Sequence, residues 1–148
     1  MREIKFRAWD KETSSIRKVV RIDFDNDMFN LQLRFPTENA PKNWKLRKFE
    51  QCEVMQYTSL KDKNGVDIYE GDIVRSIPNS GTCGIAYVNG CSLTDRIIIW
   101  LDDDAKFGWQ LTNGSIEQSG YCLTKNNCDI FEVIGNIHEN PELLTDNN

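Results

Sequence analysis

The segment MQYTSLKDKNGVDIYEGDIV, residues 55–74, carries the strongest signal for the fold. It opens with apolar and β-favouring residues and is then interrupted by Asp62–Gly65, a run that favours turns. A second interruption precedes the β-branched pair Ile73–Val74, where Gly71 allows a sharp bend and Asp72 can accept bonds from backbone N–H groups. The stretch therefore predicts strand, turn and strand.

The rest of the chain carries the same β signals. Residues 4–9 and 28–35 alternate between apolar and polar side chains, which is the period of a half-buried strand. Residues 16–24 are rich in β-branched residues, and Asp23–Asp27 is a candidate hairpin turn. Further β-rich segments are Glu53–Tyr57, Ile73–Ile77, Ile85–Val88, Arg96–Leu101, Phe107–Leu111 and Ile130–Ile134.

Three Asn-Gly dipeptides punctuate these segments, at residues 64–65, 89–90 and 113–114. Asn-Gly suits the positive φ angles of a type I′ turn, so each dipeptide predicts a tight hairpin. The regular spacing of strands and turns indicates a mainly β protein. We expect a small antiparallel barrel or sandwich of SH3-like character.

We expect one domain over residues 1–144 and a frayed tail over 145–148. Within that domain, residues 1–36 form a basic N-terminal element of three strands, and residues 50–144 form a barrel-like core. Pro36–Pro41 is the best internal boundary between them.

Helix is scarce in this sequence. Asn39–Phe49 is predicted to be either a short helix or an ordered loop. Near the C-terminus, Asn140 is a capping residue and Pro141 suits the first helical position, so a short helical turn is expected there.

Two blocks, Met55–Val74 and Val133–Leu144, together with the opening Arg2–Asp10, resemble the YopX family of small phage and prophage proteins. The resemblance covers nearly the whole chain, and Ile97–Trp109 is similar as well. It implies a phage or prophage setting and self-association, and the family brings no settled activity. One departure is Ser59, where YopX-like sequences tend to have Gly; a positive φ there would strain the serine.

Composition fits an ordinary globular protein, with 39% hydrophobic and 28% charged residues among 148. The longest apolar run, Ile97–Leu101, is far too short to span a membrane. Met1–Phe6 lacks the uncharged segment of a signal peptide. We therefore expect a cytoplasmic protein with no membrane partner. The phage setting that the resemblance implies makes this the cytoplasm of the host bacterial cell.

Signals for catalysis, cofactors and metals are weak. The five cysteines are Cys52, Cys83, Cys91, Cys122 and Cys128. None forms a Cys-x-x-Cys pair, so reduced thiols are favoured over zinc ligands.

The acidic run Asp102–Asp104 is interpreted as a solvated hairpin loop rather than a cation site. The single histidine, His138, would face away from Glu139 on a strand, so we expect it to be structural. The sequence predicts no catalytic residue, no cofactor and no enzyme.

Charge is unevenly distributed along the chain. Residues 1–50 carry a net charge of +4 and residues 51–148 a net charge of −9. Such polarity favours head-to-tail association or docking on a charged partner. The ordinary alternative is a chance imbalance between two solvated surfaces.

A basic cluster surrounds one tryptophan. Its members are Lys42, Trp44, Lys45, Arg47 and Lys48. Cations neutralise phosphates and an aromatic face stacks on an unpaired base, so the cluster is a candidate contact for nucleic acid or another partner. Arg17, Lys18 and Arg21 would assist it. In the alternative interpretation, Trp44 and Leu46 are core anchors and the cations point outwards.

These observations favour a non-enzymatic, homo-oligomeric binding module that acts through contacts with an unknown host or phage protein. Exposed strand edges, which readily accept another chain, support that expectation. The alternative is a nucleic-acid-binding accessory protein of phage replication or regulation.

Overall fold

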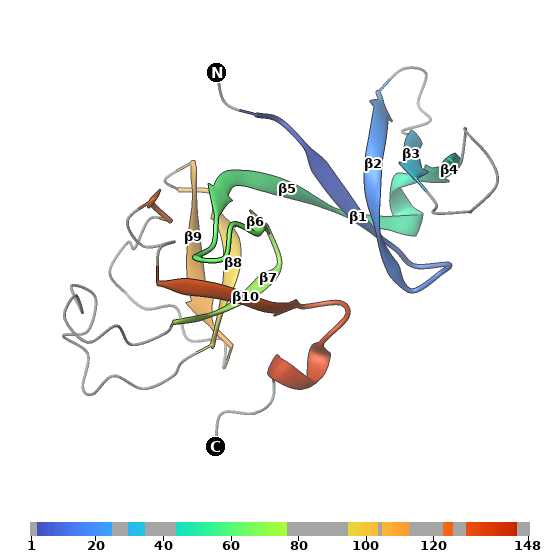
Figure 1. The fold of residues 1–148 in the computed structure, drawn as a ribbon. Coiled ribbons are helices and arrows are strands. Elements are labelled where there is room, and N and C mark those ends of the chain that lie inside the picture. Colours follow the sequence, from blue (N-terminus) through green and yellow to red (C-terminus); the bar gives the residue numbers. More distant parts are fainter. Residues whose placement is uncertain are drawn as a thin grey trace. The chain divides into compact units, whose positions relative to one another are not determined.

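The computed structural model describes residues 3–24, 30–34, 44–76, 95–103, 105–112, 123–125 and 130–144 (Figure 1). The described strands are β1 (Phe6–Asp10), β2 (Ser15–Asp23), β3 (Asn30–Arg34), β4 (Trp44–Lys48), β5 (Cys52–Lys61), β6 (Asp67–Tyr69), β7 (Asp72–Ser76), β8 (Asp95–Leu101), β9 (Lys106–Leu111) and β10 (Phe131–Asn136). Short 3₁₀ turns lie at Phe49–Gln51 and Pro141–Leu144. The predicted β class and the C-terminal helical turn are therefore confirmed. Within the described residues the strands form open antiparallel sheets rather than a closed barrel.

The chain divides into two compact units, unit 1 (Met1–Tyr57) and unit 2 (Thr58–Asn148), and the division falls inside β5. One sheet has the order β4-β3-β2-β1-β5-β6, and the other has the order β10-β7-β8-β9. The sequence had suggested an internal boundary at Pro36–Pro41. The division lies elsewhere because β4 pairs with β3 and β5 pairs with β1, which joins the segments on both sides of residues 36–41 in one sheet.

Unit 1 is an antiparallel meander of β1 to β4, with the first half of β5 on the other side of β1. The three predicted N-terminal strands are present, but two further strands join them. The prediction of a helix or loop over Asn39–Phe49 is wrong for residues 44–48, which form β4. Leu46 and Arg47 occupy opposite faces of that strand, and the open edge of β3 supplies its pairing partner.

The core of unit 1 lies on one face of this sheet. Its buried members are Ala8, Leu31, Leu33 and Cys52. Half-buried Val19, Ile22, Phe49 and Val54 pack against them. The alternation predicted for residues 28–35 is confirmed at Leu31 and Leu33, each 0% exposed, while residues 28 and 29 lie outside the described chain. Full burial of such a side chain contributes about 1.5–3 kcal/mol.

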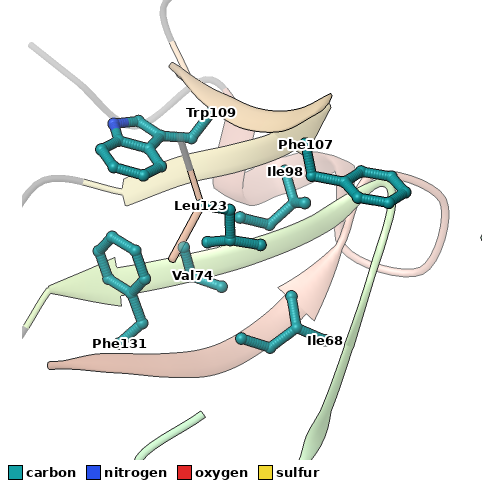
Figure 2. Packing of buried hydrophobic residues seen from close by; sticks show 7 residues of the cluster. All are labelled: Ile68, Val74, Ile98, Phe107, Trp109, Leu123 and Phe131. Carbon is teal, nitrogen blue, oxygen red and sulfur yellow. The ribbon is translucent and has the colours of Figure 1, made fainter. Parts of the chain in front are cut away.

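The core of unit 2 is aromatic and aliphatic, as Figure 2 shows. Its members are Ile68, Val74, Ile98, Phe107, Trp109, Leu123 and Phe131. They come from β6 to β10 and from residue 123, so β6 contributes Ile68 to the same core as the four-stranded sheet. The rings of Trp109 and Phe131 meet edge to face, with centroids 5.5 Å apart. This geometry adds to the stabilisation from burial alone.

The turn at Asn64-Gly65 differs from the predicted type I′ hairpin. Positive φ occurs at Gly65 (81°) and not at Asn64, and the Gly65 N–H donates to the Asp62 carbonyl at 3.0 Å. The Asp62 carboxylate accepts the N–H groups of Asn64 and Val66 at 2.8 and 2.9 Å. These bonds favour a longer loop that closes on a left-handed glycine. The other two Asn-Gly dipeptides and Ile85–Val88 lie outside the described residues.

Two other predicted turns are confirmed. β8 and β9 form an antiparallel hairpin around exposed Asp102 and Asp103. Gly71 has a φ of 76° and donates its N–H to the Ile98 carbonyl at 2.8 Å, which fits the predicted sharp bend. Asp72 accepts the Tyr69 N–H at 2.7 Å, as expected. The Asp23–Asp27 turn and the tail at 145–148 fall largely or wholly outside the described residues.

Candidate functional site

The face of the unit 1 sheet opposite its core carries a row of cations. Arg7 of β1 pairs with Lys18 of β2, Lys18 with Arg34 of β3, and Arg34 with Trp44 of β4. Directly opposed residues of antiparallel strands project on the same face, so these four side chains share one face of the sheet. We call this the outer face. Lys18, Arg34 and Trp44 are exposed and Arg7 is half-buried.

A second row lies beside the first. Arg21 pairs with Gln32 and Gln32 with Leu46, while Lys48 lies opposite Asn30 at the end of β4. Trp44 and Leu46, two residues apart on β4, are 45% and 54% exposed. The outer face is therefore basic along its middle, and at the β4 edge it exposes the apolar side chains of Trp44 and Leu46 beside Lys48.

The strand geometry divides the basic cluster predicted from sequence. Trp44 and Lys48 lie on the outer face, whereas Lys45 lies opposite the buried Leu33 and Arg47 opposite the buried Leu31. Lys42 is outside the described residues. The alternative in which Trp44 and Leu46 anchor the core and the cations all point outwards is wrong, because both apolar side chains are exposed and Arg47 is buried.

Arg47 belongs to a buried ion pair. Its Nε lies 3.2 Å from Oδ1 of Asp10, and its Nη2 lies 2.9 Å from the Glu12 carboxylate. Burial alone would raise the pKa of Asp10, but hydrogen bonds from Arg47, from Thr13 and from the Glu12 N–H lower it below its ordinary value of 3.8. This pair is a structural element of unit 1, so Arg47 is not a surface contact residue.

The three cations that were expected to assist this cluster, Arg17, Lys18 and Arg21, also lie on different faces of the sheet. Lys18 and Arg21 lie on the outer face, and Arg21 is bonded to Asp23 at 2.8 Å. Arg17 lies opposite the buried Ala8, on the core side. Arg34 was missed from the sequence because only the pairing of β2, β3 and β4 places it between Lys18 and Trp44.

The two units differ in the sign of their net charge. Unit 1 contains twelve Lys and Arg against nine Asp and Glu, a net charge of +3, and unit 2 contains six against fourteen, a net charge of −8. Ion pairs of unit 1 include those of Lys5, Lys11, Arg21 and Arg47. Lys18 and Arg34 are exposed cations, so the middle of the outer face is basic.

In the two blocks that resemble the YopX family, Met55–Val74 and Val133–Leu144, polar side chains of unit 2 stabilise turns. The Asp62 carboxylate accepts a third backbone bond, from the Val133 N–H at 3.0 Å, which ties the β5–β6 turn to β10. Asn136 Oδ1 accepts the N–H groups of His138 and Glu139, and its Nδ2 donates to the Glu139 carboxylate at 2.7 Å. His138 therefore lies in a turn whose neighbouring carboxylate is bonded to Asn136.

Cys52 is the cysteine within the described residues, and it is buried. Burial and the nearby charge of Asp10 raise the pKa of its thiol to about 11. The other four cysteines lie outside the described residues. In the part of the chain that is described, no group of three His, Cys, Asp or Glu side chains is arranged to hold a metal ion. No described helix is long and apolar enough to cross a membrane.

Comparison with known proteins places this arrangement in a family. The family model described as YopX protein matches residues 5–145. A similar solved structure is the crystal structure of protein EF1440 from Enterococcus faecalis, with 31% identity and a TM-score of 0.63 over 97% of this chain and 99% of that chain. No curated protein matches the chain significantly. The chain belongs to the YopX protein family.

Proposed function

We propose that this YopX protein is a non-enzymatic binding module that holds single-stranded nucleic acid on the outer face of unit 1. The setting implied by the family resemblance is that of a phage or prophage accessory protein in the host cytoplasm. One observation carries the proposal: Lys18 and Arg34 are directly opposed on an exposed sheet face, flanked by Arg7 and Trp44 in the same row.

Like charges directly opposite each other destabilise a sheet. A polyanion bound along the row of cations neutralises this repulsion, and it releases its own counterions on binding. The cations that destabilise the free sheet therefore favour binding of a polyanion. The whole chain is acidic, with a pI of about 4.9, but unit 1 by itself carries a net charge of +3. Trp44 adds an exposed aromatic surface at the end of the row.

The test is fluorescence anisotropy of a labelled oligothymidylate over a range of salt concentrations. We expect log K to fall linearly with log salt concentration. The double variant Lys18→Gln/Arg34→Gln should weaken binding and flatten this dependence. The matched control Lys61→Gln/Lys125→Gln removes two exposed charges from unit 2 and should behave as the unaltered chain. Arg47 is left intact in all variants, since its loss would disturb the fold. Binding unaffected by the first double variant contradicts the proposal.

A second candidate function is homo-oligomeric assembly with protein partners, which the opposite net charges of the two units favour. Assembly by adding a strand of another chain to the β4 edge is less favourable than association of the oppositely charged units. The Leu46 carbonyl already accepts Arg47 Nη1 at 3.2 Å, and the Lys48 N–H donates to Gln51 Oε1 at 2.9 Å, which leaves fewer backbone groups for an added strand.

Two measurements separate the candidates. Sedimentation velocity at low and high salt should show an oligomer that dissociates at high salt if the charged units associate. A monomer at both salt concentrations contradicts the assembly function. Affinity capture from infected cells, with and without nuclease, complements it. Partners that are lost after nuclease support nucleic-acid binding, and a protein partner that survives supports the assembly function.

A further inference from the structure

We infer that the bound strand crosses the β-strands of unit 1, with its phosphates along the Arg7–Lys18–Arg34 row and an unpaired base stacked on Trp44. This inference rests on the proposed function and adds the path of the ligand and the residue that selects single-stranded over duplex nucleic acid.

The path follows from the register. The four residues stand on four consecutive strands, so the row runs perpendicular to the strand direction. Neighbouring strands are about 4.8 Å apart, which makes the row about 14 Å long from Arg7 to Trp44. In the second row, Gln32 and Leu46 carry no charge, and the charge of Arg21 is paired with Asp23 at 2.8 Å. A single backbone fits this narrow line of charge better than the two backbones of a duplex.

The stacking residue follows from exposure. Trp44 is 45% exposed on β4, the terminal strand of its sheet, directly beside Arg34. Leu46 is 54% exposed two residues along the same strand and extends the apolar surface. An unpaired base offers a free face to such a surface, whereas the bases of a duplex are already stacked on one another. The β4 edge therefore recognises the base, and the cations hold the backbone.

The experiment measures anisotropy for the full chain and its variants, with a labelled oligothymidylate and with a labelled duplex. Trp44→Ala should lower affinity for the single strand about fivefold to a hundredfold, as expected for the loss of one base–aromatic stack. Its salt dependence should stay unchanged, and duplex affinity should not respond. Trp44→Phe should retain most of the affinity. Arg34→Gln should instead reduce the slope of log K against log salt by about 0.7, the value for one phosphate of a single strand.

Lys45→Gln is the matched control for Arg34→Gln, because Lys45 is an exposed cation of the neighbouring strand β4 and lies on the core side of the sheet. Its slope should equal that of the unaltered chain. Inorganic polyphosphate, which has no bases, should bind the Trp44→Ala variant and the unaltered chain equally. The stacking inference is overturned if Trp44→Ala lowers the affinity for polyphosphate as much as the affinity for oligothymidylate, or if it leaves oligothymidylate binding unchanged. The proposed function stands in either case. Absence of any oligonucleotide binding overturns both. Circular dichroism of each variant confirms that unit 1 is folded.

Discussion

Arg47 and Asp10, thirty-seven positions apart, form a buried ion pair in which Arg47 Nε lies 3.2 Å from Asp10 Oδ1. Asp10 lies at the end of β1 and Arg47 in β4, although β2 and β3 separate these strands in the sheet order. Three strand spacings amount to about 14 Å in a flat sheet, so the contact indicates a sheet that curls towards its core face. The pair joins the first and fourth strands of unit 1.

Removing both partners of this pair should cost less stability than the sum of the two single removals. Arg47→Met leaves the Asp10 carboxylate, which is 0% exposed, without its cation. We expect a loss of about 3–5 kcal/mol in the free energy of unfolding. The double variant Asp10→Ala/Arg47→Met should lose less than the sum of the single changes, because it leaves no unpaired buried charge. Urea unfolding of the four chains measures this coupling, and strictly additive losses would show that the pair is unimportant.

Acid should weaken unit 1 through Asp10. Hydrogen bonds and the charge of Arg47 outweigh the opposing effect of burial and lower the pKa of Asp10 below 3.8 in the folded state. A carboxyl whose pKa is depressed by folding stabilises the protein above its unfolded pKa, and this contribution is lost as the pH falls through the folded value. Urea midpoints of the unaltered chain and Asp10→Asn should therefore converge as the pH falls below 3.8. A gap that stays constant over that range contradicts this assignment.

Ser59 should gain stability when it is replaced by glycine. Its φ is 70°, in the left-handed region that the comparison with YopX-like sequences had suggested. A non-glycine residue there costs about 1–2 kcal/mol, and the extra flexibility of glycine in the unfolded chain offsets about 0.5–1 kcal/mol of any gain. Ser59→Gly should therefore raise the melting temperature by a few degrees, as measured by calorimetry. The matched control is Ser15→Gly in β2, where φ is not positive, and that change should lower the melting temperature.

Cys52 should be protected from thiol reagents in the native protein. Burial and the charge of Asp10 raise the pKa of its thiol to about 11, so the reactive thiolate is scarce near pH 8. Native protein treated with iodoacetamide and then digested should yield an unmodified Cys52 peptide by mass spectrometry. The same treatment in concentrated urea should modify it fully. Rapid labelling under native conditions would mean that unit 1 opens readily around β5.

Much of the fold follows from local patterns. The alternation at Leu31 and Leu33, the bend at Gly71 and the hairpin after Leu101 depend on neighbouring residues, and all three are confirmed. The family-like block at residues 55–74 likewise forms its turn from bonds within the block, chiefly those of the Asp62 carboxylate. The β4 strand was missed because its stability comes from pairing with β3 and not from its own lysine-rich sequence.

Local sequence patterns are enough to identify a mainly β protein of the YopX family, with a basic N-terminal part and an acidic remainder. Which cations are accessible to a ligand depends instead on how the strands pair in the folded chain. Adjacent residues of a strand point to opposite faces, so β4 places Trp44 on the outer face while burying Arg47 against Asp10. Strand pairing then brings in Arg34 and Lys18, because a binding surface on a sheet is assembled across strands and not along the chain.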